Sequence, residues 1–199
     1  MGGGGELIRQ LDIFFNEDYY NHANETDTQA SSIYNATSQP WKGQRLIRKL
    51  LVGEDVIQYY FNDNSKGIDP YIGRIYKNQP EAYLRTMDDD AGAMSAWWVM
   101  RSLGFSVVNV GQPMFYLNAP LFDHYEIRRN DGSVLKVSAK SAHKLFYIQN
   151  LQIDGQITQN NFISFDQLQH SKHINFNLSE NFSQSFGTKN QMVTHLDQN

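Results

Sequence analysis

The chain has 199 residues, 40% of them hydrophobic, which is typical of a globular protein with one sizeable core or two small ones. Its formal net charge of −4 gives no broad basic field, which argues against nucleic-acid binding by phosphate neutralisation. The absence of cysteine excludes disulfides, thiolate metal sites and a cysteine nucleophile. A metal ion would therefore have to be held by oxygen atoms or histidine.

The N-terminal sequence has none of the features of a secretory signal. Met1 is followed by glycine at residues 2–5 and then by Glu6, with neither a basic n-region nor an apolar h-region. No apolar stretch approaches the roughly 18 residues that a membrane-spanning helix needs. The sequence predicts no signal peptide and no membrane span.

Apolar residues recur at helical spacing through the first half of the chain. They are Leu7, Ile8, Leu11, Phe14 and Phe15, then Leu46, Ile47, Leu50 and Leu51, then Val56, Ile57, Tyr60 and Phe61, and finally Met94, Trp97, Trp98, Met100, Arg101 and Leu103. Gly104 stands where a C′ glycine would end the last helix. The connections at residues 17–40 and 62–92 are polar and long, and loops of that length are usually functional or disordered.

After Gly104 the pattern becomes short and alternating, which predicts strands. The expected strands are residues 106–110, 114–118, 125–129, 134–139, 145–153 and 174–178. Turn residues such as Asn130-Asp131-Gly132 and Asp154-Gly155 separate them. The sequence thus predicts an α+β protein, with a helical domain over residues 1–104 and an antiparallel β module over residues 105–199.

Asp88-Asp89-Asp90 concentrates like charge where a helix is about to begin. Adjacent carboxylates raise one another's pKa, and residues at i and i+2 of an extended segment point to the same side. Asp88 and Asp90 could therefore share one water molecule and form a general base. The alternative is a solvated run of charge in which Asp90 or a neighbour caps the helix.

A second polar segment places His22, Asn24 and Glu25 close together after the first helix. Amide, carboxylate and backbone carbonyl oxygens suit calcium, a hard cation. The alternative is that these residues only form turns and caps. His170 and His173 are interpreted as a surface pair in a turn before a strand, and the tryptophans as core residues, with a place beside a sugar-sized cleft as the alternative.

Several motifs in order resemble the last third of glycoside hydrolase family 92, the calcium-dependent exo-acting α-mannosidases. The motifs are Leu11-Asp12-Ile13-Phe14-Phe15, Tyr20-Asn21-His22-Ala23-Asn24-Glu25, Gln39-Pro40-Trp41-Lys42-Gly43-Gln44, the run from Asp88 to Trp98, and Ala119-Pro120-Leu121-Phe122-Asp123. The resemblance covers nearly the whole chain. Three positions depart from the family pattern, since Ala93, Ala23 and Thr26 stand where Gln, Gly and Pro are usual.

The resemblance implies a role for each matching position. Asn24, Glu25 and the backbone carbonyl of Ala23 would hold calcium. Asp88 and Asp90 would activate the attacking water. His22 and Trp98 would contact the substrate, a mannose-containing glycan.

The resemblance also implies an architecture of which this chain would be a part. The helices would belong to an (α/α)6 toroid, and the family's general acid, a glutamate, and its N-terminal β-sandwich belong to upstream segments. We therefore expect a C-terminal fragment that is inactive alone, needs the missing N-terminal part or a second chain, and derives from a periplasmic or secreted parent. The alternative is a carbohydrate-binding or interaction module without catalysis.

Overall fold

A computed structural model describes residues 4–17, 19–20, 22, 28–52, 57–60, 71–74, 90–107 and 111–189. The helical elements are α1 (Gly4–Asn16), the 3-10 helix η1 (Ala30–Ala36), α3 (Pro40–Val52), the 3-10 turn η2 (Asp90–Gly92), α4 (Ala93–Ser102) and α5 (Phe165–His170). The strands are β1 (Ile57–Tyr60), β2 (Tyr71–Arg74), β3 (Phe105–Ser106), β4 (Met114–Leu117), β5 (His124–Arg128), β6 (Val134–Ser138), β7 (Tyr147–Ile153), β8 (Gln156–Thr158), β9 (Phe162–Ser164) and β10 (His173–Ser179). The mixture confirms the α+β class.

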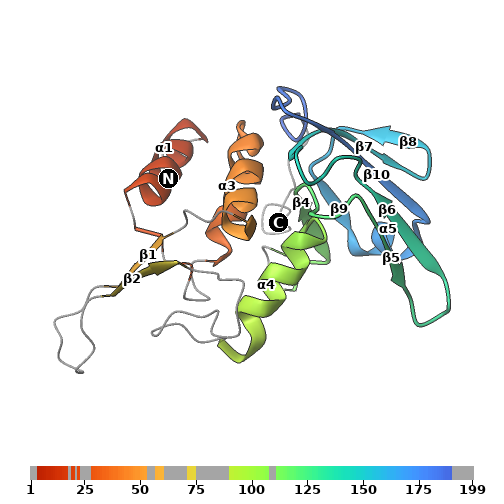
Figure 1. Cartoon of the computed structure of the whole chain (residues 1–199). Coiled ribbons are helices and arrows are strands. Elements are labelled where there is room, and N and C mark those ends of the chain that lie inside the picture. The colour runs from red at the N-terminus through yellow and green to blue at the C-terminus, as the bar shows by residue number, and fades with distance from the viewer. Residues whose placement is uncertain are drawn as a thin grey trace.

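α1 and α3 lie on one side of the molecule and the larger sheets on the other, with α4 between them and the short α5 among the strands (Figure 1). Ile47, Leu50 and Leu51 of α3 are buried with Met94 and Trp97 of α4 in one core cluster. Gly43 allows α3 to approach η1 closely, because an added Cβ would lie 3.1 Å from the Cβ of Tyr34. None of the described helices combines the length and apolar character needed to cross a membrane.

The β half contains a five-stranded sheet in the order β5-β6-β10-β7-β8 and a three-stranded sheet in the order β3-β4-β9. Leu135, Ile148, Leu151 and Phe176 are among the fully buried residues of its core. All of the described strand pairs are antiparallel except β6 with β10, which are parallel. The exception follows from topology, since β10 reaches β6 through a long crossover that contains α5.

Turn and cap residues form as the sequence predicts. Gly104 follows α4 with φ of +92°, and an added Cβ there would lie 2.9 Å from the carbonyl oxygen of Asn118. Asp154 and Gly155 both have positive φ, 47° and 89°, as a type I′ turn between β7 and β8 requires. These positions fix the start of β3 and the register of the β7–β8 hairpin.

The prediction of a helix through Val56 and Phe61 is wrong where the structure describes it. Ile57–Tyr60 form strand β1, which pairs with β2 in an antiparallel ladder. The run is short and rich in β-branched and aromatic residues, so its spacing fits a strand as well as a helix. The two long connections also contain structure, because η1 lies within residues 17–40 and β2 within residues 62–92.

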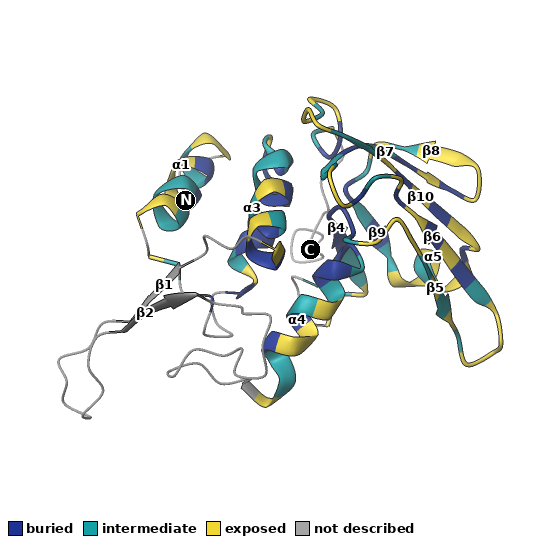
Figure 2. Ribbon diagram, viewed as in Figure 1, coloured by how far each residue is buried: buried dark blue, intermediate teal, exposed yellow. Residues whose placement is uncertain are grey.

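Polar side chains link the helical half to the β half. Gln44 of α3 accepts a hydrogen bond from the backbone nitrogen of Ile148 at 2.9 Å, and Asn161 donates to the carbonyl oxygen of Asn35 at 2.8 Å. The C-terminal end of α4 is buried beside β4 (Figure 2). The boundary near residue 104 stays a prediction.

Candidate active site

The backbone turns sharply just before α4. Ala91 (φ 57°, ψ 31°) and Gly92 (φ 93°, ψ 0°) are both left-handed, and Gly92 rather than an aspartate is the N-cap of α4. Of the alternative in which Asp90 or a neighbour caps this helix, the cap is therefore the neighbour Gly92, and Asp90 opens the preceding 3-10 turn. A non-glycine residue in this conformation carries strain, and such strain is concentrated at functional sites.

Trp97 of α4 contacts the chain on both sides of segment 23–27, the predicted calcium-binding segment. Its indole Nε1 donates a hydrogen bond to the backbone carbonyl of Thr28 at 2.9 Å. Its ring meets the imidazole of His22 edge-on, with 4.5 Å between centroids. The residues that precede and follow the segment are therefore held against one helix, about one turn from its N-terminus.

His22 is fully buried, at 0% exposure. Its Nδ1 shares a 2.5 Å hydrogen bond with the hydroxyl of Tyr20. Burial, with a smaller contribution from the positive charge of Arg101, lowers the pKa of His22 to about 3. His22 is therefore neutral at physiological pH, and its imidazole can exchange hydrogen bonds without carrying a positive charge.

Arg101 lies one turn beyond Trp97 and is 1% exposed. Its Nη2 donates to Gln29 Oε1 at 2.9 Å and to Ser32 Oγ at 3.1 Å, and its guanidinium lies 5.2 Å from the centroid of the Trp97 ring. Burial lowers the pKa of Arg101 to about 9, so it remains a cation at neutral pH. The cation–π contact and the hydrogen bonds fix α4 against the segment that follows residue 27.

Trp98 packs against the same core cluster that contains Trp97 but bonds to a different segment. It is half-buried beside the cluster around Ile47, and its Nε1 donates to the carbonyl oxygen of Leu51 at 3.3 Å. Its expected contact with substrate stays a prediction. Trp97 and Trp98 thus link the same helix to two different segments.

Most of the residues that the sequence assigns to the site lie outside the described residues. Asp88, Ala23, Asn24 and Glu25 do so, whereas His22, Trp98 and the backbone of Asp90 are described. Within the part of the chain that the structure describes, no three His, Asp or Glu side chains gather closely enough to hold a metal ion. The roles of Trp97 and Arg101 were missed by sequence reasoning, although their spacing of four residues places them on one helix face.

Comparisons with known proteins decide the family. The model of the glycosyl hydrolase family 92 catalytic domain matches residues 1–70 and 64–180, most of the chain. The chain belongs to glycosyl hydrolase family 92. Among solved structures, this family 92 chain is similar to the family 92 glycosyl hydrolase ccman5, with 26% identity, a TM-score of 0.85, and coverage of 97% of this chain and 27% of that one.

Two structures from Bacteroides thetaiotaomicron share the fold of this family 92 chain. The inverting mannosidase BT2199 has 24% identity and a TM-score of 0.73, over 95% of this chain and 26% of that one. The α-mannosidase BT3965 has 22% identity and a TM-score of 0.72, over 94% of this chain and 23% of that one. The chain therefore spans about a quarter of the length of these relatives. A comparison with curated proteins gave no match.

Proposed function

We propose that this chain supplies the calcium-binding and water-activating part of an inverting exo-α-mannosidase. Family 92 membership and the likeness to solved structures described as mannosidases support the reaction class. The observation that carries the proposal is the position of Trp97, which contacts His22 and Thr28 on either side of segment 23–27. The helix that follows the acidic run in sequence thereby contacts residues on both sides of the segment that would supply the calcium ligands.

The donor set fits calcium. Asn24 would offer an amide oxygen, Glu25 a carboxylate and Ala23 a backbone carbonyl, which are the ligands that calcium prefers. When bound, the ion would hold hydroxyls of the terminal mannose and favour distortion of its ring. Asp88 and Asp90 would take the proton of the attacking water, and the acid would stand about 6.5–9.5 Å away, as inversion requires.

The proposed enzyme needs more protein than this chain contains. The chain spans 27% of the length of ccman5, and none of Glu6, Glu17 or Glu25 matches the family position of the general acid. The acid would come from an N-terminal part of the enzyme or from a second chain that completes the (α/α)6 toroid. We propose that the chain is inactive alone and that its parent works in the periplasm or outside the cell.

The test separates calcium binding from catalysis. Calorimetry with calcium chloride should show one calcium site in the unsubstituted chain. In Glu25→Gln the affinity for calcium should fall by at least about tenfold. Glu17→Gln is the matched control, because Glu17 is exposed and lies outside segment 23–27. Equal affinities in the two variants would refute the ligand assignment.

Catalysis is measured as release of mannose from an aryl α-mannoside and from α-mannobiose, with calcium or with EDTA. We expect no release by the chain alone, and calcium-dependent release once a polypeptide with the sandwich and the glutamate is added. Activity of the 199-residue chain by itself would overturn the claim that an external acid is needed.

The alternative is a carbohydrate-binding or interaction module without catalysis. It would be supported if the chain bound calcium and mannose, while no added upstream segment produced release.

A further inference from the structure

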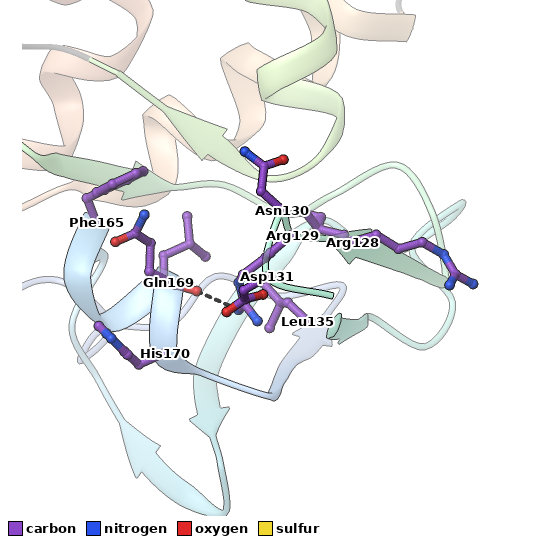
Figure 3. Close-up of a pocket in the computed structure, with 10 residues that line it drawn as sticks. Arg128, Arg129, Asn130, Asp131, Leu135, Phe165, Gln169 and His170 are labelled. Atoms are coloured by element: carbon purple, nitrogen blue, oxygen red, sulfur yellow. Dashed lines mark hydrogen bonds between the residues drawn. The ribbon is translucent and has the colours of Figure 1, made fainter. Parts of the chain in front are cut away.

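A pocket of about 510 Å³ lies between the β5–β6 hairpin and α5, in the β half of the chain (Figure 3). The hairpin provides residues 127–131 and Leu135, and α5 provides Phe165, Leu168, Gln169 and His170. Its volume is within the range of about 300–1,000 Å³ that is usual for small-molecule sites. None of the roles proposed above uses this pocket.

The walls of the pocket are joined by Arg129. Its Nη2 donates to the carbonyl oxygens of Leu168 at 2.8 Å and Ser171 at 2.6 Å, and its Nη1 donates to Ser133 Oγ at 3.0 Å. Ser164 caps α5 by accepting a hydrogen bond from the backbone nitrogen of Gln167 at 3.0 Å. The hairpin and the helix are therefore held together before any ligand arrives, which lowers the entropic cost of binding.

The lining combines an aromatic surface with polar groups that can form further hydrogen bonds. Phe165 is 44% exposed, so its apolar ring is accessible to a ligand. The amides of Asn130 and Gln169 are exposed, and neither makes a hydrogen bond to another residue in the described ranges. Hydrogen bonds from Ser133 hold the pKa of Asp131 below its usual range, so this carboxylate is ionised and only accepts hydrogen bonds.

The nearby cations do not make this an anion site. The side chain of Arg128 points away from α5 (Figure 3) and lies 3.8 Å from the carboxylate of Glu126. Arg129 is occupied by the contacts that join the walls, and His170 lies 3.3 Å from the carboxylate of Asp166. The polar groups that remain are two amides and a carboxylate, which suit a neutral ligand that carries hydroxyl groups.

We infer that this pocket binds a pyranose unit of a neutral glycan. The apolar face of the sugar ring would lie on Phe165, and its hydroxyls would donate to Asp131 and exchange hydrogen bonds with Gln169 and Asn130. A sugar is the ligand class whose ring presents an apolar face and hydroxyl donors together. The inference is independent of the proposed mannosidase site, because no residue is shared between them.

The experiment is a titration of the full chain with methyl α-D-mannopyranoside, methyl β-D-glucopyranoside and inorganic phosphate, followed by NMR in the presence of EDTA. We expect saturable binding of at least one glycoside with a dissociation constant on the order of 1 mM. Binding that persists in EDTA separates this pocket from the proposed calcium-dependent site. Saturable binding of phosphate that displaces the sugar, or no saturation by either glycoside up to about 50 mM, would overturn the inference.

Matched variants locate the binding. Phe165→Ala should weaken it on the order of tenfold, because the stacking surface is lost. Phe122→Ala is the control, since Phe122 is 45% exposed and lies outside the pocket lining. Asp131→Asn keeps the side-chain shape and should also weaken binding, which covers the case in which Phe165→Ala does not fold. Two results would refute the assignment to this pocket. One is equal affinity for the glycoside in Asp131→Asn and the unsubstituted chain, and the other is an equal loss of affinity in the Phe122 and Phe165 variants.

Discussion

Replacing Trp97 with phenylalanine removes one hydrogen bond and keeps an aromatic ring, so it tests how firmly α4 holds the chain beside segment 23–27. The bond from Nε1 to Thr28 is 2.9 Å long, and Trp97 is 4% exposed. Loss of such a bond costs about 0.5–1.5 kcal/mol, and the space left by the smaller ring adds about 1 kcal/mol. We expect Trp97→Phe to lower the free energy of unfolding by about 2 kcal/mol, roughly a thirtyfold shift in the folding equilibrium.

Trp98→Phe is the matched control on the same helix. Its hydrogen bond to Leu51 is longer, at 3.3 Å, and its side chain is only half-buried. We expect a loss below about 1 kcal/mol. Urea denaturation followed by far-UV circular dichroism measures both variants. Equal losses would refute the reasoning that the contact with Thr28 is the stronger link.

Calcium gives the same pair a second readout. A ligand that binds only the folded state raises the free energy of unfolding by RT ln(1 + [L]/Kd). If Trp97 positions the flanks of segment 23–27, calcium should stabilise Trp97→Phe less than Trp98→Phe. If calcium stabilised both variants equally, Trp97 would have no role in positioning the proposed calcium-binding segment.

Four further substitutions test individual residues, each by urea denaturation. Ala91→Gly should raise the free energy of unfolding by about 0.5–1 kcal/mol, because Ala91 has φ of 57° and glycine adopts this conformation without strain. Gly92→Ala should lower the free energy of unfolding by about 1 kcal/mol for the converse reason. Changes of the opposite sign would contradict the left-handed turn. Gly187→Ala should lower the free energy of unfolding by about 2–3 kcal/mol, because Gly187 has φ of 72° and the new Cβ would lie 2.6 Å from Cγ of the buried Asn161. An unchanged value would contradict both the left-handed backbone and the close contact. His22 has a folded pKa of about 3, below its unfolded value of about 6.5, so the unfolded state takes up the proton first and stability falls as pH drops between these values. The free energy of unfolding should fall by about 2 kcal/mol between pH 7 and pH 5, and this fall should be absent in His22→Asn. An equal dependence on pH in that variant would show that other groups cause the effect.

Elements with a long, clear period were predictable from the sequence. The helices around Leu11, Ile47 and Trp97 form, and the last of them ends before Gly104 as expected. Each has enough turns for its apolar face to be recognised, and glycine at the C′ position has a direct steric reason.

Short elements were not predictable in the same way. Ile57–Tyr60 has too few residues to separate a helical period from a strand, and α5 has only six residues and follows β9 directly. His170 accordingly ends a helix rather than lying in a turn, although it and His173 are both exposed, as expected. The pairing of β10 with β6 depends on contacts between residues far apart in sequence, which local patterns do not contain.

The chemical groups assigned to the candidate site stay predictions, whereas the contacts that hold α4 beside segment 23–27 were not predictable from the sequence. Oxygen ligands and paired aspartates can be recognised from residue type and family motif. The contact of Trp97 with Thr28 joins residues 69 positions apart. A tryptophan in an apolar helix gives no sign of which distant carbonyl it will reach, so Trp97 was assigned to the core, with a place beside a sugar-sized cleft as the alternative.

The central position of β10 has a consequence for synthesis of the chain. β10 is the last of the described strands in sequence order and joins β6 to β7, so until it emerges the two hairpins of the large sheet remain separate two-stranded ribbons. Such ribbons are marginally stable in water and have unpaired edges. At about 5–20 residues per second, the interval between the end of β6 and the end of β10 lasts roughly 2–8 s. Throughout that time the edges of β6 and β7 are open to other strands, so chaperone binding or aggregation of the nascent chain competes with folding until β10 is in place.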